Sequence, residues 1–416
     1  MGRVSGLSAK EIGRVRGRLI EFAGEMFGSM ARKDQRRWGE TYLRGLMLDG
    51  KRKSIEPMAA RLADGDEQCL QQFVNQSPWD PVAVRRALAR RMTAEIAPAA
   101  WVIDDTGFPK FGKMSVGVAR QYSGALGKVG NCQIGVSINA ASDEASCALD
   151  WRLFIPKEWD ELSESNQARR TKARLPEEVH HVEKWRLALE MIDELRSWGL
   201  VPPVVTGDGA YGDITELRSG LSEREIHYVL DVKSITSAYS EDVMPEQPEK
   251  KPGRGRRPLA RYRADPSSLR EQALAAGQDA STEVTWREGT RGKMTSRFLA
   301  LRVRPANIDL RRAAHRDGQE LALCWLLCEW PTDAEEPTKY WLSNLPPDTP
   351  LSQLVGLAKM RWRIEHDYRE LKDALGLDHF EGRTYRGWHH HVTLVSVAHG
   401  FLTLERRRRP PQRAAA

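Results

Sequence analysis

The chain has 416 residues, of which 40% are hydrophobic and 13 are tryptophan, and it carries a formal net charge of +7. This length accommodates two or three domains with large cores, and the composition excludes a wholly disordered chain. The sequence has no apolar run of about 18 residues, so we expect no membrane-spanning helix. The N-terminal segment MGRVSGLSAKEIGRVRGRL lacks the apolar core of a signal peptide. The positive charge is consistent with a polyanionic partner, and equally with a protein that is merely basic.

Cysteine usage indicates a reducing compartment. Five cysteines, an odd number at irregular spacing, do not suggest a disulfide framework, and we expect a cytoplasmic protein. Cys324 and Cys328 lie in the apolar run LALCWLLCEW without a second pair to complete a zinc site. We therefore interpret them as buried packing residues.

Residues 1–95 are predicted to form an all-helical domain. Ser8 and Glu11 have the spacing of a capping box at the start of its first helix. Further helices are predicted at 33–48, 55–64, 67–75 and 80–96. The last of these carries four arginines on adjacent turns, among them Arg85 and Arg86. Their density favours a DNA-binding domain, and a dimerisation or packing bundle is the alternative.

Residues 96–235 are predicted to form three consecutive strands, followed by alternating strands and helices. The strands are AAWVIDDTGF, NCQIGVSINAA and ASCALDWRLFIP, followed after a basic connector (167–176) and a helix (177–198) by VVTGDG and IHYVLDVKS. This order predicts an α/β fold with a mixed sheet flanked by helices.

The C-terminal half is predicted to contain a β-rich insertion. Residues 236–345 begin with a Pro-, Gly- and charge-rich segment (236–275), interpreted as a mobile basic loop, and continue with four strands. Residues 346–405 carry two helices, at about 351–374 and 388–405. Residues 406–416 form a basic tail that we expect to be disordered.

The segment RWRIEHDYRELK places four functional side chains along one stripe of the predicted helix. Arg361, Glu365, Tyr368 and Lys372 are spaced i, i+4, i+7 and i+11. A carboxylate flanked by cations suits a metal-dependent site acting on a phosphodiester, with the bases holding phosphate. The alternative is a solvated helix face with an ion pair.

Two further acidic positions stand at predicted strand ends, where ligand sites form in sheets of this type. Asp104 and Asp105 lie on the first strand, and Asp208 ends a later one between two glycines. Three converging carboxylates could hold two Mg²⁺ ions about 3.5–4 Å apart, an arrangement that clamps an in-line phosphoryl displacement. Alternatively, they are an ordinary turn aspartate, a strand-end aspartate and a surface glutamate.

The sequence resembles the DDE transposases of bacterial insertion sequences, which have an RNase H-like catalytic core. Within them it resembles the branch with a Tyr-Arg-Glu-Lys signature with gaps of two, three and six residues. Arg361, Glu365 and Lys372 match that spacing, whereas Ala358 stands at the Tyr position. The resemblance covers about residues 40–405 and includes a β-rich insertion between the second and third acids.

The resemblance implies an RNase H-like fold and assigns Asp105, Asp208 and Glu365 as catalytic residues and metal ligands. Asp105 is preferred to Asp104 because a threonine follows it, and only one of two successive strand residues can face the metals. The implied cofactor is Mg²⁺ or Mn²⁺, two ions. The expected DNA-binding residues are Arg361, Lys372, Tyr368, Arg169, Arg170, Lys172, Arg85 and Arg86.

The implied activity is metal-dependent cleavage at transposon ends and strand transfer into target DNA, that is, cut-and-paste transposition through a hairpin. The implied partners are the terminal inverted repeats, the target DNA and a second copy of the chain in a homodimer, in the bacterial nucleoid. Two alternatives stay open: a non-catalytic DNA-binding regulator derived from a transposase, and an RNase H-like junction or repair nuclease.

Two remaining features have competing interpretations. In similar transposases an insertion tryptophan stacks on a flipped base, but Trp325 and Trp341 lie in apolar surroundings and no single tryptophan is assigned. His389, His390 and His391 cannot all face one ion from a helix, so we interpret them as packing or phosphate-contact residues rather than metal ligands.

Overall fold

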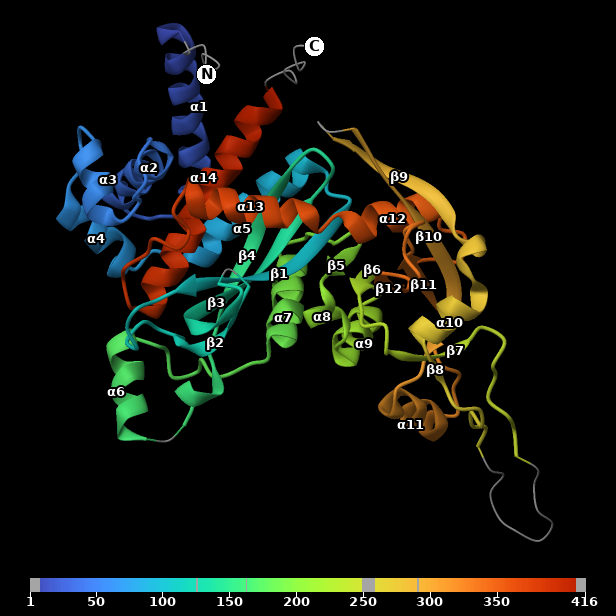
Figure 1. The fold of residues 1–416 in the computed structure, drawn as a ribbon. Coiled ribbons are helices and arrows are strands. Elements are labelled where there is room, and N and C mark those ends of the chain that lie inside the picture. The colour runs from blue at the N-terminus through green and yellow to red at the C-terminus, as the bar shows by residue number, and fades with distance from the viewer. Residues whose placement is uncertain (1–7, 125, 162, 249–258, 290–291, 409–416) are drawn as a thin grey trace. The chain divides into compact units, whose positions relative to one another are not determined.

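The structure is a computed structural model that describes residues 8–124, 126–161, 163–248, 259–289 and 292–408. The chain divides into two compact units (Figure 1). The first comprises Met1–Ala99, Ile103–Val201 and Trp362–Ala416, and the second comprises Ala100–Val102 and Pro202–Arg361. The polypeptide therefore leaves the first unit and returns to it at Trp362.

The N-terminal part of the first unit is helical, as predicted. Its helices are α1 (Ala9–Met26), α2 (Lys33–Met47), α3 (Ile55–Arg61), α4 (Glu67–Asn75) and α5 (Pro81–Ile96). Ser8 and Glu11 form the predicted capping box at the start of α1. Asp80 caps α5, whose first residue is Pro81, the position where a missing N–H costs no helical hydrogen bond.

The strands of the first unit follow these helices. They are β1 (Ala100–Pro109, with its first three residues in the second unit), β2 (Ala119–Ser123), β3 (Lys128–Ala141) and β4 (Ser146–Phe154). Strand β3 lies between β2 and β1 in the sheet and also pairs with β4, and both the β2 and the β4 pairing are antiparallel. Sequence inspection did not predict β2. Helices α5, α7 (Lys184–Ser197) and α14 (Tyr385–Arg408) pack on this sheet.

The structure corrects two predictions, one for a connector and one for a helix. The basic connector at 167–176 is mostly helix α6 (Glu164–Ala173), which follows the short 3₁₀ helix Lys157–Trp159 and is capped by Ser163. The predicted single helix at 351–374 is two helices, α12 (Leu351–Lys359) in the second unit and α13 (Trp362–Asp373) in the first. Arg361 therefore lies between two helices and not on the helix of Glu365, so the four-residue stripe does not exist as one helical face.

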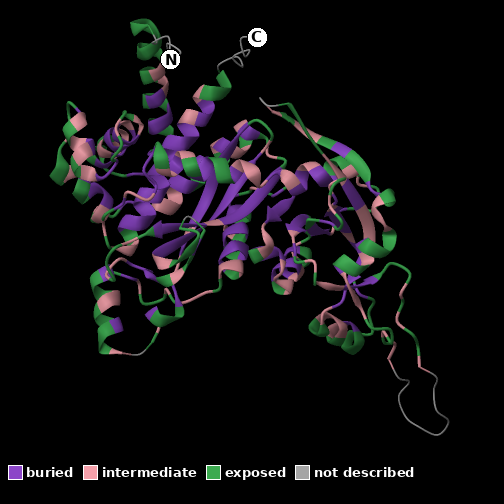
Figure 2. Ribbon diagram, viewed as in Figure 1, coloured by how far each residue is buried: buried purple, intermediate pink, exposed green. Residues whose placement is uncertain are grey.

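Helix α14 forms part of the core of the first unit. All residues from 387 to 401 are buried, and the helix packs against α2, α4, α5 and β4 (Figure 2). The predicted helix at 388–405 is thus confirmed, with three further residues at each end, although a helix buried on all sides carries no amphipathic pattern. Its last turn, Arg406–Arg408, belongs to the predicted basic tail, and the rest of that tail lies outside the described residues.

The second unit contains a mixed sheet. The first three residues of β1 are followed in order by β5 (Val205–Gly207), β6 (Tyr228–Asp231), β12 (Lys339–Ser343), β11 (Cys324–Glu329), β10 (Gly292–Pro305), β7 (Ser237–Ser240) and β8 (Ser267–Ser268). Strand β9 (Thr282–Gly289) pairs with β10. Strands β5 and β6 are parallel, and the pairings from β6 to β8 are antiparallel. This arrangement confirms the predicted class, a mixed sheet flanked by helices.

The helices of the second unit are α8 (Gly209–Gly212), α9 (Thr215–Glu223), α10 (Leu269–Ala276), the 3₁₀ helix Gln278–Ala280, α11 (Ile308–Asp317) and α12. The predicted four strands of the insertion are confirmed as β9 to β12. Helix α11 was not predicted, although Asn307 caps it and Gly318 ends it in the left-handed conformation. The segment 236–275, predicted as a loop, contains β7, β8 and most of α10, and its residues 249–258 lie outside the described part.

Within the described residues, no helix combines the length and apolar character needed to cross a membrane. Cys324 and Cys328 are buried in β11, which confirms their interpretation as packing residues.

Candidate active site

The first predicted catalytic acid, Asp105, lies on strand β1. It is the one residue in the interior of this strand that is only partly buried. Asp104 is 5% exposed, whereas the side chain of Asp105 is 22% exposed. The two carboxylates point to opposite faces because successive strand residues alternate. The Asp104 carboxylate accepts a hydrogen bond from the backbone N–H of Asp105 at 2.8 Å. Asp104 is thus tied into the strand, and Asp105 is the accessible acid.

Asp105 is paired with a lysine that the sequence did not single out. The Lys184 Nζ lies 2.9 Å from Asp105 Oδ2, and Lys184 is the first residue of α7. The two residues are 79 positions apart, so only the packing of α7 against the sheet brings them together. A cationic group therefore already neutralises the Asp105 carboxylate.

Helix α13 crosses the same region of the first unit and carries Glu365. One turn after Glu365, the buried Tyr368 hydroxyl lies 2.7 Å from the Ser137 hydroxyl on β3. Burial, followed by the charge of Asp104, raises the pKa of Tyr368 well above its usual value, and Asp105 contributes in the same direction. Glu365 is exposed on this helix, which packs on β3 and β4.

Two other residues of α13 have structural contacts. The Lys372 Nζ donates to the Gly107 carbonyl on β1 at 2.9 Å, and its partial burial lowers its pKa. Glu370, the other glutamate of the helix, accepts a hydrogen bond from Arg406 at 2.7 Å. Glu370 is thus committed to α14, which agrees with the choice of Glu365 as the candidate acid. Tyr368, expected to contact DNA, is instead a buried packing residue.

In the second unit, Asp208 lies at the turn between β5 and α8. Its carboxylate caps the short helix by accepting from the Ala210 N–H at 3.0 Å. The turn requires glycine at Gly212, because an added Cβ would come 1.9 Å from the Asp231 carbonyl oxygen. The Arg361 guanidinium is 3.5 Å from Asp208 Oδ2. Asp208, like Asp105, thus has a basic partner from its own unit.

Asp231 is an acid beside this turn that sequence reasoning missed. It ends β6, the parallel neighbour of the strand that precedes Asp208. Burial raises its pKa, the Asp208 charge adds to the rise, and Lys339, 3.5 Å away, opposes it. The signal was present in the sequence as a second strand-end aspartate in IHYVLDVKS, since parallel strands end at one edge of a sheet.

Among the described residues, no group of three or more His, Cys, Asp and Glu side chains is arranged to hold a metal ion. The grouping of Asp105, Asp208 and Glu365 around metal therefore stays a prediction.

The two arginines predicted to bind DNA on α5 differ in exposure. Arg85 is 3% exposed, and its Nε lies 2.8 Å from a carboxylate oxygen of the fully buried Asp150. A buried guanidinium does not contact solvent-borne phosphate, so the expected DNA-binding role of Arg85 is wrong. Arg86, the next residue, is exposed, and its guanidinium lies 5.7 Å from the Trp198 ring.

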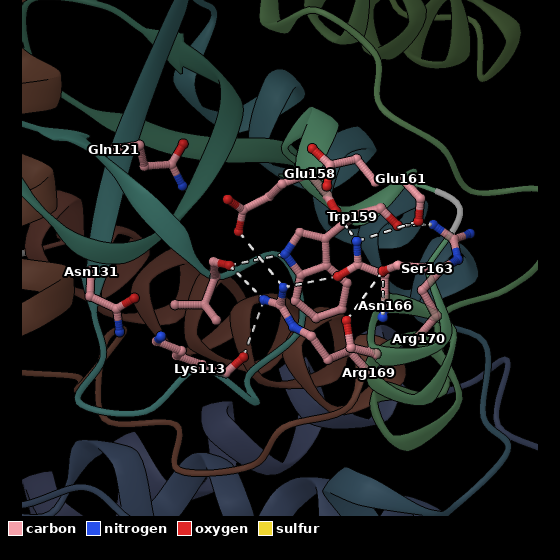
Figure 3. Close-up of polar contacts among 12 residues, drawn as sticks. Lys113, Gln121, Asn131, Glu158, Trp159, Glu161, Ser163, Asn166, Arg169 and Arg170 are labelled. Atoms are coloured by element: carbon pink, nitrogen blue, oxygen red, sulfur yellow. Dashed lines mark hydrogen bonds and ion pairs between the residues drawn. The ribbon is translucent and has the colours of Figure 1, made fainter.

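The arginines of helix α6 are also held by the protein (Figure 3). Arg169 stacks on the Trp159 ring at 4.3 Å and donates to the carbonyls of Lys113 and Val118, both at 3.2 Å. Arg170 pairs with Asp160 at 2.9 Å and donates to several backbone carbonyls. Through these contacts both side chains stabilise the surrounding loops, instead of binding phosphate as predicted. Lys172 on the same helix is exposed.

The three consecutive histidines of α14 are buried and have separate partners. The His391 Nδ1 lies 2.9 Å from the Tyr42 hydroxyl, and its Nε2 lies 3.0 Å from the Gly376 carbonyl. A neutral ring that accepts from Tyr42 and donates to Gly376 satisfies both contacts. His389 and His390 contact other backbone carbonyls. The predicted packing role is confirmed.

The buried His391 should make the first unit sensitive to acid. Burial lowers the pKa of His391 to about 4, below its usual 6.5. Because His391 binds a proton more weakly in the folded state than in the unfolded state, its full contribution to stability is present above pH 6.5. This contribution is lost as the pH falls toward 4. The full loss is about 3 kcal/mol. Urea unfolding at a series of pH values should show a shallower decline between pH 6.5 and 4 for His391→Gln than for the wild-type protein. Equal slopes would contradict a neutral His391.

Comparison with known proteins identifies the family. Residues 25–293, well over half of the chain, match the family model described as "DDE superfamily endonuclease". The matched region contains Asp105 and Asp208 and ends before Glu365. A protein of Microchaete diplosiphon, described as a probable transposase for insertion sequence element IS701, is 28% identical over 207 residues, 49% of this chain and 50% of the relative. The alignment with this curated relative thus spans about half of its length. The chain belongs to the DDE superfamily endonucleases.

Proposed function

We propose that the protein is a DNA transposase that cleaves DNA at the ends of a mobile element and joins those ends to target DNA. The observation that carries the proposal is the family match, which spans the half-buried Asp105 and the turn residue Asp208. The similarity to a probable insertion-sequence transposase supports transposition over other endonuclease activities. DNA is the substrate that this membership implies.

Membership in an endonuclease family of this kind implies dependence on a divalent metal, and the donor chemistry fits. Asp105 and Asp208 offer partly exposed carboxylate oxygens, which hard cations prefer, and each already attracts a positive group. We assign Asp105, Asp208 and Glu365 as the ligands of Mg²⁺ or Mn²⁺, two ions. When bound, such ions activate the attacking oxygen and stabilise the leaving oxygen of a phosphodiester.

The position of Glu365 in the chain supports its assignment as the third metal ligand. Arg361 contacts Asp208 and precedes Glu365 by four residues. Four residues reach at most about 14 Å between their Cα atoms. Asp104 and Asp105, for their part, raise the pKa of Tyr368, one turn after Glu365. Within the first unit, the helix of Glu365 packs on β3, the neighbour of the strand that carries Asp105.

The proposed reaction begins with hydrolysis at the element's end, which frees a 3′-hydroxyl. That hydroxyl then attacks the opposite strand to give a hairpin, and after reopening attacks the target DNA. Arg361, Lys372, Arg86 and Lys172 are proposed to contact phosphates, the first two near the reacting bond. A homodimer on paired ends is proposed because both ends must be joined to one target.

The experiment is incubation of the purified protein with DNA from the boundaries of its own element, with Mg²⁺ or Mn²⁺ and a target plasmid. Cleaved ends and strand-transfer products are expected. Cleavage of branched DNA without joining would identify a junction or repair nuclease. Salt-dependent binding without any cleavage would identify a DNA-binding regulator and refute the proposed activity.

The Lys184 ammonium is expected to compete with metal for Asp105. Lys184→Met should lower the Mn²⁺ concentration needed for half of the thermal stabilisation by about fivefold, since one nearby positive charge contributes roughly 1 kcal/mol of repulsion. The matched control is Arg186→Met, which removes an exposed cation paired with Glu183 on the same helix. An unchanged Mn²⁺ dependence in Lys184→Met would show that Asp105 does not bind the ion.

A further inference from the structure

The loop after β1 presents an apolar ring to solvent at the edge of a pocket. Phe111, two residues after the end of β1, is fully exposed, at 112% of its reference area. It lines a pocket of about 490 Å³ in the first unit. Covering a phenylalanine ring contributes about 1.5–3 kcal/mol, so a ligand in this pocket that contacted the ring would gain that free energy.

The pocket around Phe111 is basic. Three segments that are distant in the sequence form it, at 51–52, 109–115 and 378–383. Its charged lining consists of four basic side chains, Lys51, Arg52, Lys110 and Arg383, and two acidic ones, Asp378 and Glu381. Lys51, Arg52 and Arg383 are exposed, and Arg52 makes only a solvent-exposed ion pair with Glu381 at 3.4 Å. Exposed pairs of this kind are weak, so these cations are available to an anionic ligand.

The backbone that carries Phe111 is held on one side by β3. The Asn131 side-chain amide donates to the carbonyls of Lys110 at 2.6 Å and Gly112 at 3.0 Å. These two residues flank Phe111, so Asn131 holds the backbone on both sides of the ring. The Lys110 N–H donates in turn to the Asn131 carbonyl at 3.0 Å. The position of the ring's backbone is thus fixed before any ligand arrives.

The other side of the loop is held by Arg169. Its guanidinium, stacked on Trp159, donates to the carbonyls of Lys113 and Val118 (Figure 3). Farther along, the Gln133 side chain donates to the Val116 carbonyl at 2.6 Å. A ring presented by a braced loop loses little conformational entropy when a partner stacks on it, which favours binding.

An exposed aromatic ring next to basic side chains is the combination that binds single-stranded nucleic acid. The ring stacks on a base, and the cations follow the backbone. A base within a duplex offers no free face, so the partner must be unpaired. Pro109, the last residue of β1, is four positions after Asp105, about 13 Å along the strand, and Phe111 follows two positions later. This distance corresponds to a few nucleotides along a DNA strand.

We propose that Phe111 is a stacking platform for an unpaired nucleotide of the DNA substrate, with Lys51, Arg52 and Arg383 contacting the phosphates beside it. The proposal rests on the proposed function, since it takes DNA as the substrate. It assigns Asn131 and Arg169 as positioning residues that hold the platform.

The test measures binding of a single-stranded 15-nucleotide oligo-dT and of a blunt 15-base-pair duplex by fluorescence anisotropy. Phe111→Ala should weaken oligo-dT binding about 5- to 150-fold and duplex binding much less, whereas Phe111→Trp should retain both. Lys51→Ala should reduce the dependence of log K on log salt by about 0.7 for the single strand. The matched control is Tyr122→Ala, which removes an exposed aromatic ring of the same unit that does not line the pocket.

Oligo-dT binding by Phe111→Ala within twofold of the wild-type value would overturn the platform, as would an equal loss in Tyr122→Ala. Because Phe111 is exposed, its replacement is expected to leave the thermal unfolding midpoint unchanged. Cleavage of element ends is assayed separately. Cleavage without Phe111-dependent binding would reject this inference alone, and Phe111-dependent binding without cleavage would reject the transposase activity alone.

Discussion

Replacing any one of the three proposed metal ligands should abolish DNA cleavage. Asp105→Asn, Asp208→Asn and Glu365→Gln each exchange a carboxylate for a neutral amide of the same size, which removes a charge that a divalent cation needs. A metal ion contributes several kilocalories per mole to phosphoryl transfer, so we expect losses of about 10³-fold or more in cleavage rate. The rate of end cleavage in Mg²⁺ is the measurement.

These variants should still bind end DNA, because the proposed phosphate contacts lie on other residues. Glu370→Gln is the matched control: it alters a glutamate of the same helix that contacts Arg406 instead, and cleavage should persist. Retention of full activity in Asp105→Asn, Asp208→Asn or Glu365→Gln would remove that residue from the site. The result for Glu365 is the most informative of the three, because the family match ends before it.

The second large effect is expected in the core of the first unit. Asp150 is fully buried and contacts two guanidinium groups, those of Arg85 at 2.8 Å and Arg152 at 2.7 Å. Arg152 also pairs with Glu194, so removing Arg85 leaves this partly buried group with two carboxylates and one guanidinium, and hence with an uncompensated charge. Arg85→Met should therefore lower the free energy of unfolding by about 3–5 kcal/mol, measured by urea unfolding.

Arg86→Ala is the control for this prediction, because an exposed side chain on the same helix should change stability by only about 0.5 kcal/mol. The double variant Arg85→Met/Asp150→Leu should regain part of the lost stability, since it removes the buried charge together with its partner. If Arg85→Met were as stable as the wild-type protein and weakened DNA binding instead, the burial of Arg85 would be refuted and its predicted surface role restored.

Arg85 and Arg86 differ in burial, a difference that could not be predicted from the sequence. Helix α5 was predicted correctly, because Asp80 and Pro81 mark its start. The sequence alone did not reveal which arginine meets Asp150, since that partner comes from a strand 65 residues later. The density of arginines predicted a basic surface on this helix. Arg86 lies on the surface, whereas Arg85 forms an ion pair in the core.

The break between α12 and α13 was unpredictable for a related reason. The sequence from Leu351 to Asp373 contains neither proline nor a glycine at the break, so helical periodicity continues through it. The break coincides with the boundary between the two units, a tertiary property. Strand alternation, in contrast, is a strictly local rule, and it predicted that Asp104 and Asp105 point to opposite faces, of which that of Asp105 is the more exposed.

Partners from distant segments account for most of what was missed at the candidate site. Lys184 joins Asp105 only through the packing of α7, and Asn131 and Arg169 brace the Phe111 loop from two other elements. Asp231 is different, because its strand-end position was visible in the sequence. Candidate aspartates could thus be proposed from strand ends in the sequence, whereas the basic residues that contact them could not.

The most direct test of the account is a change of metal preference at the three acids. Asp105→Cys, Asp208→Cys and Glu365→Cys each replace a hard oxygen ligand with a softer sulfur ligand, which Mn²⁺ accepts better than Mg²⁺ does. We predict that end cleavage by each variant is lost in Mg²⁺ and partly restored in Mn²⁺. Cleavage in Mg²⁺ at the wild-type rate by any of the three would contradict the claim that these carboxylates together hold the metal.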